Sequence, residues 1–429
     1  MSVKESIKDR ASKIDVSQIP LDEIDVSNPY LFQNDTIGEY FKRLRKEDPV
    51  HYCANGHSGA YWSVTKFNDI VRVDTDHNTF SSDSARGGIA LDGPGARSES
   101  NNRAGAPDMG LTMFIAMDPP KHDEQRKVVS PIVAPHNLET LEPIIRERAA
   151  AILDSLPVGE EIDWVDRVSI ELTTMTLATL FDFPWEERRK LTRWSDVVTS
   201  SPGNGVDSWE QWQQELTECA MYFKELWDQR VGGEQKHDLI SMLAGSPATA
   251  NMPFGEFLGN LLLLIVGGND TTRNSITGGV LALNQNPAEY AKLMNDPSLI
   301  TNMVPEIIRW QTPLSHMRRT AVRDAEVGGK KIREGDKLAM WYLSGNRDSE
   351  VIERADEFLI DRKNPRHHVS FGFGIHRCVG NRLAELQLRI IWEEIVTRFR
   401  KVEVVGEPVR SLSNLIHGFT KMPVVLHSL

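Results

Sequence analysis

Apolar residues recur at helical spacing over most of this chain. In residues 37–47 they occupy one face of a helix, and Asp48-Pro49 follows as a stop signal. The same spacing predicts helices over 67–74, 141–156, 168–181, 184–199 and 209–230. The pattern therefore predicts a fold in which helices dominate.

Shorter segments alternate apolar and polar residues, as β-strands do. Residues 51–53 and 61–65 are two such segments, and the glycine-containing turns between them predict a hairpin. Further strands are expected at 325–332, 337–342, 402–405 and 424–427. The β-rich parts thus lie near 48–66, 320–343 and 402–429. The expected fold class is mainly α with small β-sheets.

No linker divides the 429 residues, although their number alone would suggest two or three domains. The stretch 81–110 is rich in serine, glycine, asparagine and arginine, but apolar periodic segments resume on both sides of it. Loops of that length inside a fold are usually functional, often as lids. We therefore expect residues 1–429 to form one domain with a long internal loop.

Charge and cysteine content exclude several classes of function. The 49 basic and 61 acidic residues give a net charge of -12, which argues against general affinity for nucleic acid or anionic membranes. Residues 1–15 have no apolar core, and the longest apolar run, 261–266, is far too short to span a bilayer. Cys53, Cys219 and Cys378 are too widely spaced for a disulfide framework. These features predict a cytoplasmic protein without a nucleic-acid partner or a membrane anchor.

One cysteine stands in a glycine-punctuated loop that leads directly into a long helix. Segment 371–380 reads Phe-Gly-Phe-Gly-Ile-His-Arg-Cys-Val-Gly, and a helix is expected over roughly 381–400. The N–H groups of a tight loop and the positive end of the helix dipole would both favour a thiolate at Cys378. A lone cysteine in such a turn is usually only a buried residue. A lone buried thiolate can, however, be the sole protein ligand of a haem iron.

The helix expected over 254–284 changes character in its middle. It is apolar nearly all round from 258 to 266, so it should pass through the centre of the protein. Residues 267–272, Gly-Gly-Asn-Asp-Thr-Thr, then place polar groups where helix propensity and desolvation oppose them. Such a break favours a functional site, with Thr271 donating a proton and Asp270 relaying protons from solvent. A kinked helix with capping residues is the alternative.

Together these motifs resemble those of the cytochrome P450 family. Segment 371–380 matches the family's haem-binding signature, Phe-x-x-Gly-x-x-x-Cys-x-Gly, at every defined position. Glu306 and Arg309 resemble its buried Glu-x-x-Arg pair, a structural element behind the cysteine loop. The resemblance implies the cytochrome P450 fold, with haem b between the central helix and the loop. Cys378 would be the iron ligand, and Asp270 with Thr271 the catalytic pair.

The resemblance also implies residues that hold the haem propionates. His122 and Arg126 lie four apart, on one face of a helix that opens after an Asp-Pro-Pro turn. Spacing alone would suggest a solvated helix face, but the family places a His-x-x-x-Arg pair there to bind a propionate. The other implied partners are His376 and Arg319, with Arg318 beside it as the alternative.

By this resemblance the protein is a monooxygenase that inserts one atom of dioxygen into a C–H bond and reduces the other atom to water. No flavin or iron–sulfur module is recognisable, so electrons are expected from a separate ferredoxin and an NAD(P)H-dependent ferredoxin reductase. A cationic patch near the cysteine loop is either a docking site for the ferredoxin or a solvated basic loop. The patch consists of Arg366, His367, His368 and Arg377.

Segments 114–122, 262–274 and 309–314 look like the bacterial alkane-hydroxylase branch, whose members oxidise the terminal carbon of medium-chain alkanes, fatty acids or related apolar chains. A narrow apolar pocket is expected from Leu263, Val266, Gly267, Leu314, Met317 and Phe419. Apolar linings are generic, so a cyclic terpene or other compact apolar substrate is the alternative. The intact Asp-Thr pair disfavours a peroxygenase. The proton relay, with no recognisable signalling domain, disfavours a non-enzymatic haem sensor or carrier.

Overall fold

The computed structural model describes residues 15–91, 106–232 and 236–429. Residues 1–14 and residues 92–105 of the long loop expected over 81–110 lie outside this description. The helices are α2 (Pro29–Gln33), α3 (Ile37–Glu47), α4 (Phe67–Thr75), α5 (Lys121–Val129), α6 (Pro135–Asp154), α7 (Glu171–Phe181), α8 (Arg189–Val198), α9 (Trp209–Arg230), α10 (Leu239–Gly245), α11 (Phe254–Gln285), α12 (Pro287–Asn295), α13 (Ile300–Gln311), α14 (Tyr342–Gly345) and α15 (Asn381–Val396).

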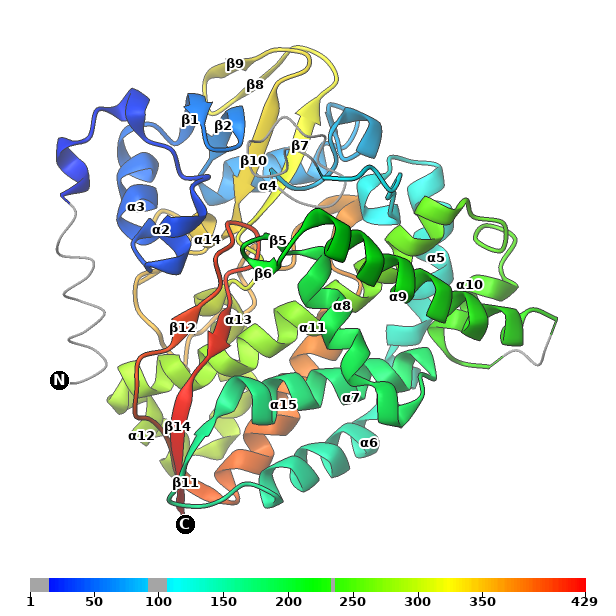
Figure 1. Ribbon diagram of the computed structural model, residues 1–429. Coiled ribbons are helices and arrows are strands. Elements are labelled where there is room, and N and C mark those ends of the chain that lie inside the picture. Colours follow the sequence, from blue (N-terminus) through cyan, green and yellow to red (C-terminus); the bar gives the residue numbers. More distant parts are fainter. Residues whose placement is uncertain (1–14, 92–105, 233–235) are drawn as a thin grey trace.

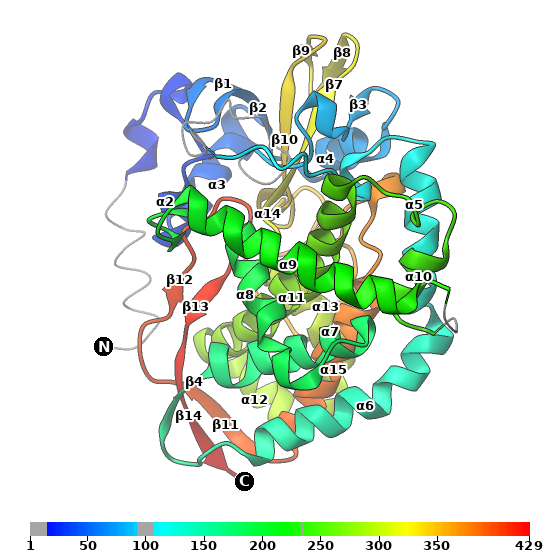
Figure 2. The ribbon, with the colours of Figure 1, turned by 45° about the vertical axis from the view of Figure 1, so that its right-hand side comes forward.

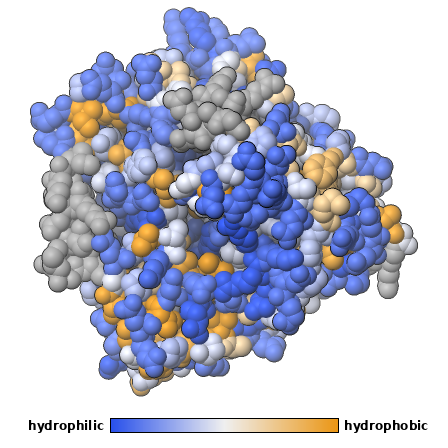
Figure 3. Space-filling view, in the orientation of Figure 1, coloured by the Kyte–Doolittle hydropathy of each residue, from blue (hydrophilic) through white to orange (hydrophobic). Residues whose placement is uncertain are grey.

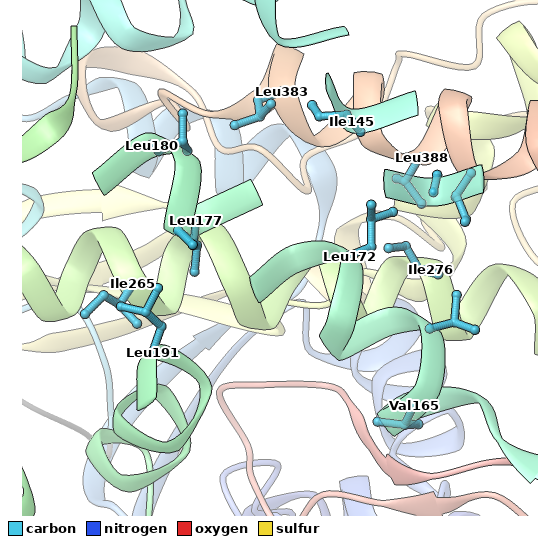
Figure 4. Packing of buried hydrophobic residues seen from close by; sticks show 14 of the residues in the cluster. Ile145, Val165, Leu172, Leu177, Leu180, Leu191, Ile265, Ile276, Leu383 and Leu388 are labelled. Carbon is cyan, nitrogen blue, oxygen red and sulfur yellow. The ribbon is translucent and has the colours of Figure 1, made fainter. Parts of the chain in front are cut away.

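Helix α11 is the central element of the helical part (Figures 1 and 2). It packs against α7, α8, α13 and α15, which is why its first half needs apolar residues on every side. Figure 4 shows Leu177 of α7, Leu191 of α8, Ile265 of α11 and Leu383 of α15, all members of the main buried cluster. The expected central helix is therefore confirmed, and its polar stretch lies inside the protein.

The strands form small sheets, and the two largest lie at opposite ends of the molecule (Figures 1 and 2). The largest has the order β1-β2-β10-β7-β3 and is antiparallel except where β10 meets β2. Another, β11-β14-β4, contains the C-terminal strand. The strands are β1 (Val50–Gly56), β2 (Gly59–Val64), β3 (Phe80–Ser81), β4 (Glu161–Asp163), β5 (Ser201–Pro202), β6 (Gly205–Val206), β7 (His316–Ala321), β8 (Ala325–Val327), β9 (Lys330–Ile332), β10 (Lys337–Trp341), β11 (Phe399–Val404), β12 (Val409–Arg410), β13 (Phe419–Lys421) and β14 (Pro423–Ser428).

Most predicted elements are confirmed, and two differences have clear causes. The helix after the cysteine loop ends at Val396, before the expected position 400, because Phe399 begins strand β11 and is buried. Strand β7 was not predicted because its centre is Arg318-Arg319, a charged pair without an alternating apolar pattern. Both arginines are buried, so tertiary contacts decide the conformation of this segment.

The surface is mostly hydrophilic on the face shown in Figure 3, with smaller hydrophobic patches between the charged residues. Within the described ranges, no helix is long and apolar enough to cross a membrane. This agrees with the sequence, in which the longest apolar run has six residues, 261–266.

Candidate active site

A cavity of about 270 Å³ lies between α11 and the cysteine loop, residues 371–380. Helix α11 and the loop contribute Leu263, Val266, Gly267, Thr271, Phe371, Gly372, His376 and Cys378 to its wall. Cys378 has a large accessible surface although protein atoms surround it, because it faces this cavity. The structure thus brings the two motifs of the sequence to opposite sides of one space.

Two glycines and a buried aspartate fix the shape of the cysteine loop. Gly372 and Gly374 have φ angles of +65° and +67°, which residues with side chains rarely adopt. Asp74, at the end of α4, is 2% exposed and accepts hydrogen bonds from the N–H of Phe373 and the guanidinium of Arg319, each at 2.7 Å. One carboxylate therefore ties the loop to both α4 and β7.

The thiol of Cys378 is subject to opposing influences. Burial raises its pKa, whereas a hydrogen bond from the N–H of Gly380 and the charges of Arg126 and Arg377 lower it. The net direction is upward. A bound metal ion would make the sulfur a thiolate, because coordination deprotonates a thiol.

The space around Cys378 fits a flat cofactor that carries acidic groups. A Cβ atom added to Gly267 on α11 or to Gly380 on the loop would meet no described neighbouring atom within 4 Å. Both ring nitrogens of buried His376, and Nε2 of His122, have no hydrogen-bond partner among the described residues. Burial lowers the pKa of His376 to about 2, so its ring is neutral and has one N–H to donate. These residues fit haem b and its propionates.

Two arginines line the same cavity, Arg126 of α5 and Arg319 of β7. Arg318 does not line it, because side chains alternate along a strand and its guanidinium lies 3.2 Å from the carbonyl oxygen of Arg86. The geometry therefore favours Arg319 over Arg318 as a propionate partner. His122 is not on the wall either, and its ring packs against that of His376 with 4.3 Å between centroids.

Thr271 and Asp270 face different sides of α11. Thr271 lines the cavity, and its hydroxyl donates to the carbonyl of Gly267 at 2.9 Å. Asp270 Oδ1 accepts a hydrogen bond from Ser195 at 2.9 Å and lies 3.0 Å from Arg273. Its Oδ2 is buried and has no partner among the residues described. Burial raises the pKa of Asp270 to about 6, although the charge of Arg273 opposes this.

Arg273 connects Asp270 to the protein surface. Besides its contact with Asp270, its Nη2 lies 2.7 Å from Oδ1 of Asp196 on α8. The side chain of Asp196 is 45% exposed. A continuous series of charged groups therefore leads from the acid of the central helix to solvent. Arg273 stays protonated, so it holds the two carboxylates in place and does not itself relay a proton.

The residues predicted to form a substrate pocket lie on the cavity wall, except one. Leu263, Val266, Gly267, Leu314 and Met317 line the cavity. Phe419 does not, because its ring packs under the guanidinium of Arg410, 4.7 Å from the centroid, and its N–H donates to Asn274. The same turn instead presents Leu415 and Ile416 to the cavity.

Other wall residues come from segments that the sequence did not single out. They include Leu177 and Leu180 of α7, Val198 and Thr199 at the end of α8, Leu239 of α10, and Met113. Amphipathic spacing predicts these helices but does not distinguish an apolar face against the core from one against a ligand. For Met113 one signal existed, namely its place just before segment 114–122, which carries part of the family resemblance.

The predicted cationic patch is smaller than expected. His368 is buried, with its ring 5.5 Å from that of Phe371, so including it in a surface patch was wrong. Arg366 is exposed but pairs with Glu385 at 2.9 Å. His367 and Arg377 are exposed.

The predicted pair of Glu306 and Arg309 is completely buried, with 2.8 Å between the two side chains. Arg362 forms a second ion pair with Glu306, and Arg309 also donates to three backbone carbonyl groups. All these charges are partnered, so the cluster has the structural role that the resemblance implied.

Comparisons with known proteins agree with this geometry. The family model "Cytochrome P450" matches residues 158–423. Linalool 8-monooxygenase of Pseudomonas putida is 36% identical over 408 residues, which cover 94% of this chain and 98% of that protein. The structure of cytochrome P450-153 from Novosphingobium aromaticivorans is 45% identical, with a TM-score of 0.86, and covers 94% of this chain and 99% of its own. The structure of CYP153D17 from Sphingomonas sp. PAMC 26605 is 46% identical, with a TM-score of 0.85, over 95% of this chain and 100% of its own.

Proposed function

The chain belongs to the cytochrome P450 family, and from that premise we propose that it hydroxylates the terminal C–H bond of a medium-chain alkane, fatty acid or similar apolar molecule. It is a monooxygenase with haem b as its cofactor. The observation that carries the substrate proposal is the apolar wall of Leu263, Val266 and Met317 beside Thr271. Burial against such a wall favours binding of a hydrocarbon by about 0.8 kcal/mol per CH₂ group.

Haem supplies the activation of dioxygen when it is bound. We propose Cys378 as the ligand of its iron, and His122, Arg126, Arg319 and His376 as the residues that hold its propionates. The positions of Arg126, Arg319 and His376 on the cavity wall support this assignment. Charged guanidinium groups and a buried ring N–H make strong hydrogen bonds to carboxylates.

Thr271 is proposed to deliver a proton at the cavity side of α11, and Asp270 to resupply it. A hydroxyl group rotates freely, so that of Thr271 can turn from the Gly267 carbonyl toward the cavity. The pKa of about 6 for Asp270 suits proton exchange near neutral pH. Arg273 stays protonated and holds Asp270 near Asp196, whose side chain is half exposed to solvent. The delivered protons end in the water molecule that the reaction releases.

Electrons are proposed to come from a ferredoxin and its NAD(P)H-dependent reductase. Arg377 is exposed and adjoins Cys378 in the chain, and His367 is exposed in the preceding segment. A cationic surface there would attract an acidic redox protein and increase its association rate. The docking proposal now rests on these two residues together with the paired Arg366.

A terpene is the second candidate substrate, because the relative that is 36% identical is named for linalool, which is a terpene. A branched terpene would need a wider space beside Thr271 than a linear chain does. The haem sensor or carrier has less support, since monooxygenase relatives and the Asp270–Thr271 pair both favour an enzyme.

Titration of the oxidised protein with dodecane, dodecanoic acid and limonene tests the substrate class. We expect a linear substrate to shift the haem from low to high spin, and turnover with a ferredoxin and its reductase to yield the terminally hydroxylated product. A spin shift and hydroxylation with limonene alone would replace the terminal-hydroxylase proposal by the terpene one. The assignment as a monooxygenase would stand in either case.

A further inference from the structure

Residues 109–115 lie directly on the first part of α11. The N–H of Thr112 donates to the carbonyl of Gly255 at 3.3 Å, and the N–H of Phe114 donates to Oδ1 of Asn260 at 2.8 Å. Asn260 is fully buried, so the second bond is shielded from solvent. This segment, called the strap below, is therefore fixed to the helix by its backbone.

Two glycines of α11 allow this contact. A Cβ atom added to Gly255 would lie less than 3.0 Å from the carbonyl oxygen of Gly110, and one added to Gly259 would lie equally close to that of Thr112. Real side chains essentially never approach so closely. The obstructing atoms belong to the backbone and cannot rotate away, so any other residue would push the strap and the helix apart.

The strap and α11 are both walls of the cavity. Met113, Phe114 and Ile115 of the strap line it. Leu262 and Leu263 of α11, within two turns of Gly259, line it too. The separation of the two backbones at Gly255 and Gly259 therefore determines how far apart these walls stand.

A buried polar network holds the strap contact from the side of α5. Asn260 Nδ2 donates to Oε1 of Gln125 at 2.9 Å, and Gln125 donates in turn to Glu256. Glu256 also pairs with Lys121. The contact is braced in this way by two helices, so the strap cannot easily slide along α11 to relieve a clash.

We propose that Gly255 and Gly259 are positioning residues that determine substrate width, because they set the distance between the strap and α11. The inference rests on the proposed function in one respect, that this cavity receives the substrate. It adds a source of selectivity outside the wall, since neither glycine lines the cavity.

The test compares the same added methyl group at two positions of α11. Gly259→Ala should move the strap outward and widen the cavity, whereas Gly267→Ala should narrow it, because a Cβ atom there meets only open space. The probes are imidazole and 4-phenylimidazole, nitrogen ligands of haem iron that differ in bulk and do not depend on the native substrate. Their dissociation constants are measured by optical titration.

We expect Gly259→Ala to favour the bulkier ligand relative to wild type, and Gly267→Ala to disfavour it, each by up to about tenfold in the ratio of the two dissociation constants. Gly38→Ala, on the exposed face of α3 with nothing near its Cβ, is the matched control and should leave the ratio unchanged. An unchanged ratio in Gly259→Ala, or a shift in the same direction as in Gly267→Ala, would overturn the proposal.

If Gly259→Ala fails to retain haem, Gly255→Ala provides the test, with the same expected direction. The reduced carbon monoxide spectrum of each variant verifies that the haem-thiolate site is intact. Titration of the same variants with dodecane and limonene then separates the two proposals. The ratio of the two dissociation constants can shift in opposite directions in Gly259→Ala and Gly267→Ala while dodecane causes no spin shift. That result would support the role of the glycines and count against the terminal-hydroxylase proposal.

Discussion

The loop side of the cavity is one continuous segment, residues 371–380, whereas the substrate side is assembled from distant parts of the chain. Helix α11, the strap, the end of α8, strand β7 and the turn at 415–416 all contribute to the substrate side. Asp74 holds the loop by accepting a hydrogen bond from the N–H of Phe373, and Glu306 belongs to a buried ion-pair cluster. The substrate side is held by apolar packing, together with the polar network that fixes the strap to α11.

The two sides of the cavity therefore have different roles, since the loop side serves the chemistry and the substrate side serves the selectivity. Buried, fully partnered charges permit one geometry, which an iron ligand requires. Apolar contacts tolerate changes of size and shape at moderate cost, so a wall made of them can change its specificity. Substitutions behind the loop should therefore remove haem binding or stability. Those on the substrate side should change turnover or selectivity while the haem site remains intact.

The largest effect is expected from Glu306→Ala, behind the loop. It leaves the buried charges of Arg309 and Arg362 without their carboxylate, which should lower the free energy of unfolding by about 3 to 5 kcal/mol. Urea unfolding followed by tryptophan fluorescence measures this. Glu403→Gln, which changes half-exposed contacts with Lys401 and His427, is the matched control and should cost less than about 1 kcal/mol. If both variants lost the same free energy of unfolding, the claim that the buried charges behind the loop are the more important for stability would be wrong.

The next effect is expected from Thr271→Ala, on the substrate side. Loss of the hydroxyl that faces the cavity should reduce product formation about 100-fold, because general acid catalysis supplies at least that factor. Substrate binding and the carbon monoxide spectrum should persist. Thr271→Ser keeps the hydroxyl and should retain most of the product yield. If Thr271→Ala forms product at the wild-type rate, the proton relay is not at this residue.

A smaller effect is expected for pH-dependent stability at Asp270. Its folded-state pKa of about 6 lies above the ordinary value of 3.8, so its favourable contribution is present at low pH and is lost as the pH rises through about 6. Between about pH 5 and about pH 7.5, wild type should lose roughly 1 kcal/mol relative to Asp270→Asn. Urea unfolding of both proteins at the two pH values measures this. A constant difference between them would show that Asp270 does not titrate in this range.

The smallest effect distinguishes two residues of the C-terminal turn. Leu415→Ala removes part of the cavity wall and should weaken dodecane binding by up to about tenfold. Phe419→Leu alters a residue that packs under Arg410 instead, so it should leave the dissociation constant nearly unchanged. Spin-state titration of both variants provides the comparison. A larger change of the dodecane dissociation constant in Phe419→Leu than in Leu415→Ala would show that Phe419 belongs to the pocket.

The sequence predicted the loop side well because its information is local. The signature around Cys378 and the polar break at Asp270 and Thr271 each lie within ten residues, and their elements have nearly the expected bounds. Strand β7 was missed because its arginines are stabilised by partners far away in the chain, such as Asp74 for Arg319. A buried ion pair of this kind leaves no periodic pattern.

Orientation was the part that the sequence could not predict. Phe419 and Ile416 are both apolar and three residues apart, and only the path of the turn decides which one meets the cavity. His368 was assigned to a cationic surface patch with its neighbours, yet it is buried against Phe371. In both cases the side chain follows packing between segments that are distant in the sequence.

The most direct test of the central claim is the visible spectrum of the reduced protein under carbon monoxide. Cys378 faces the cavity opposite Gly267, with Arg126, Arg319 and His376 around it. We predict the red-shifted Soret band of a thiolate-ligated haem in wild type, and its loss in Cys378→Ala. A wild-type spectrum without that band, in protein that contains haem, would show that Cys378 is not the iron ligand and would contradict the claim.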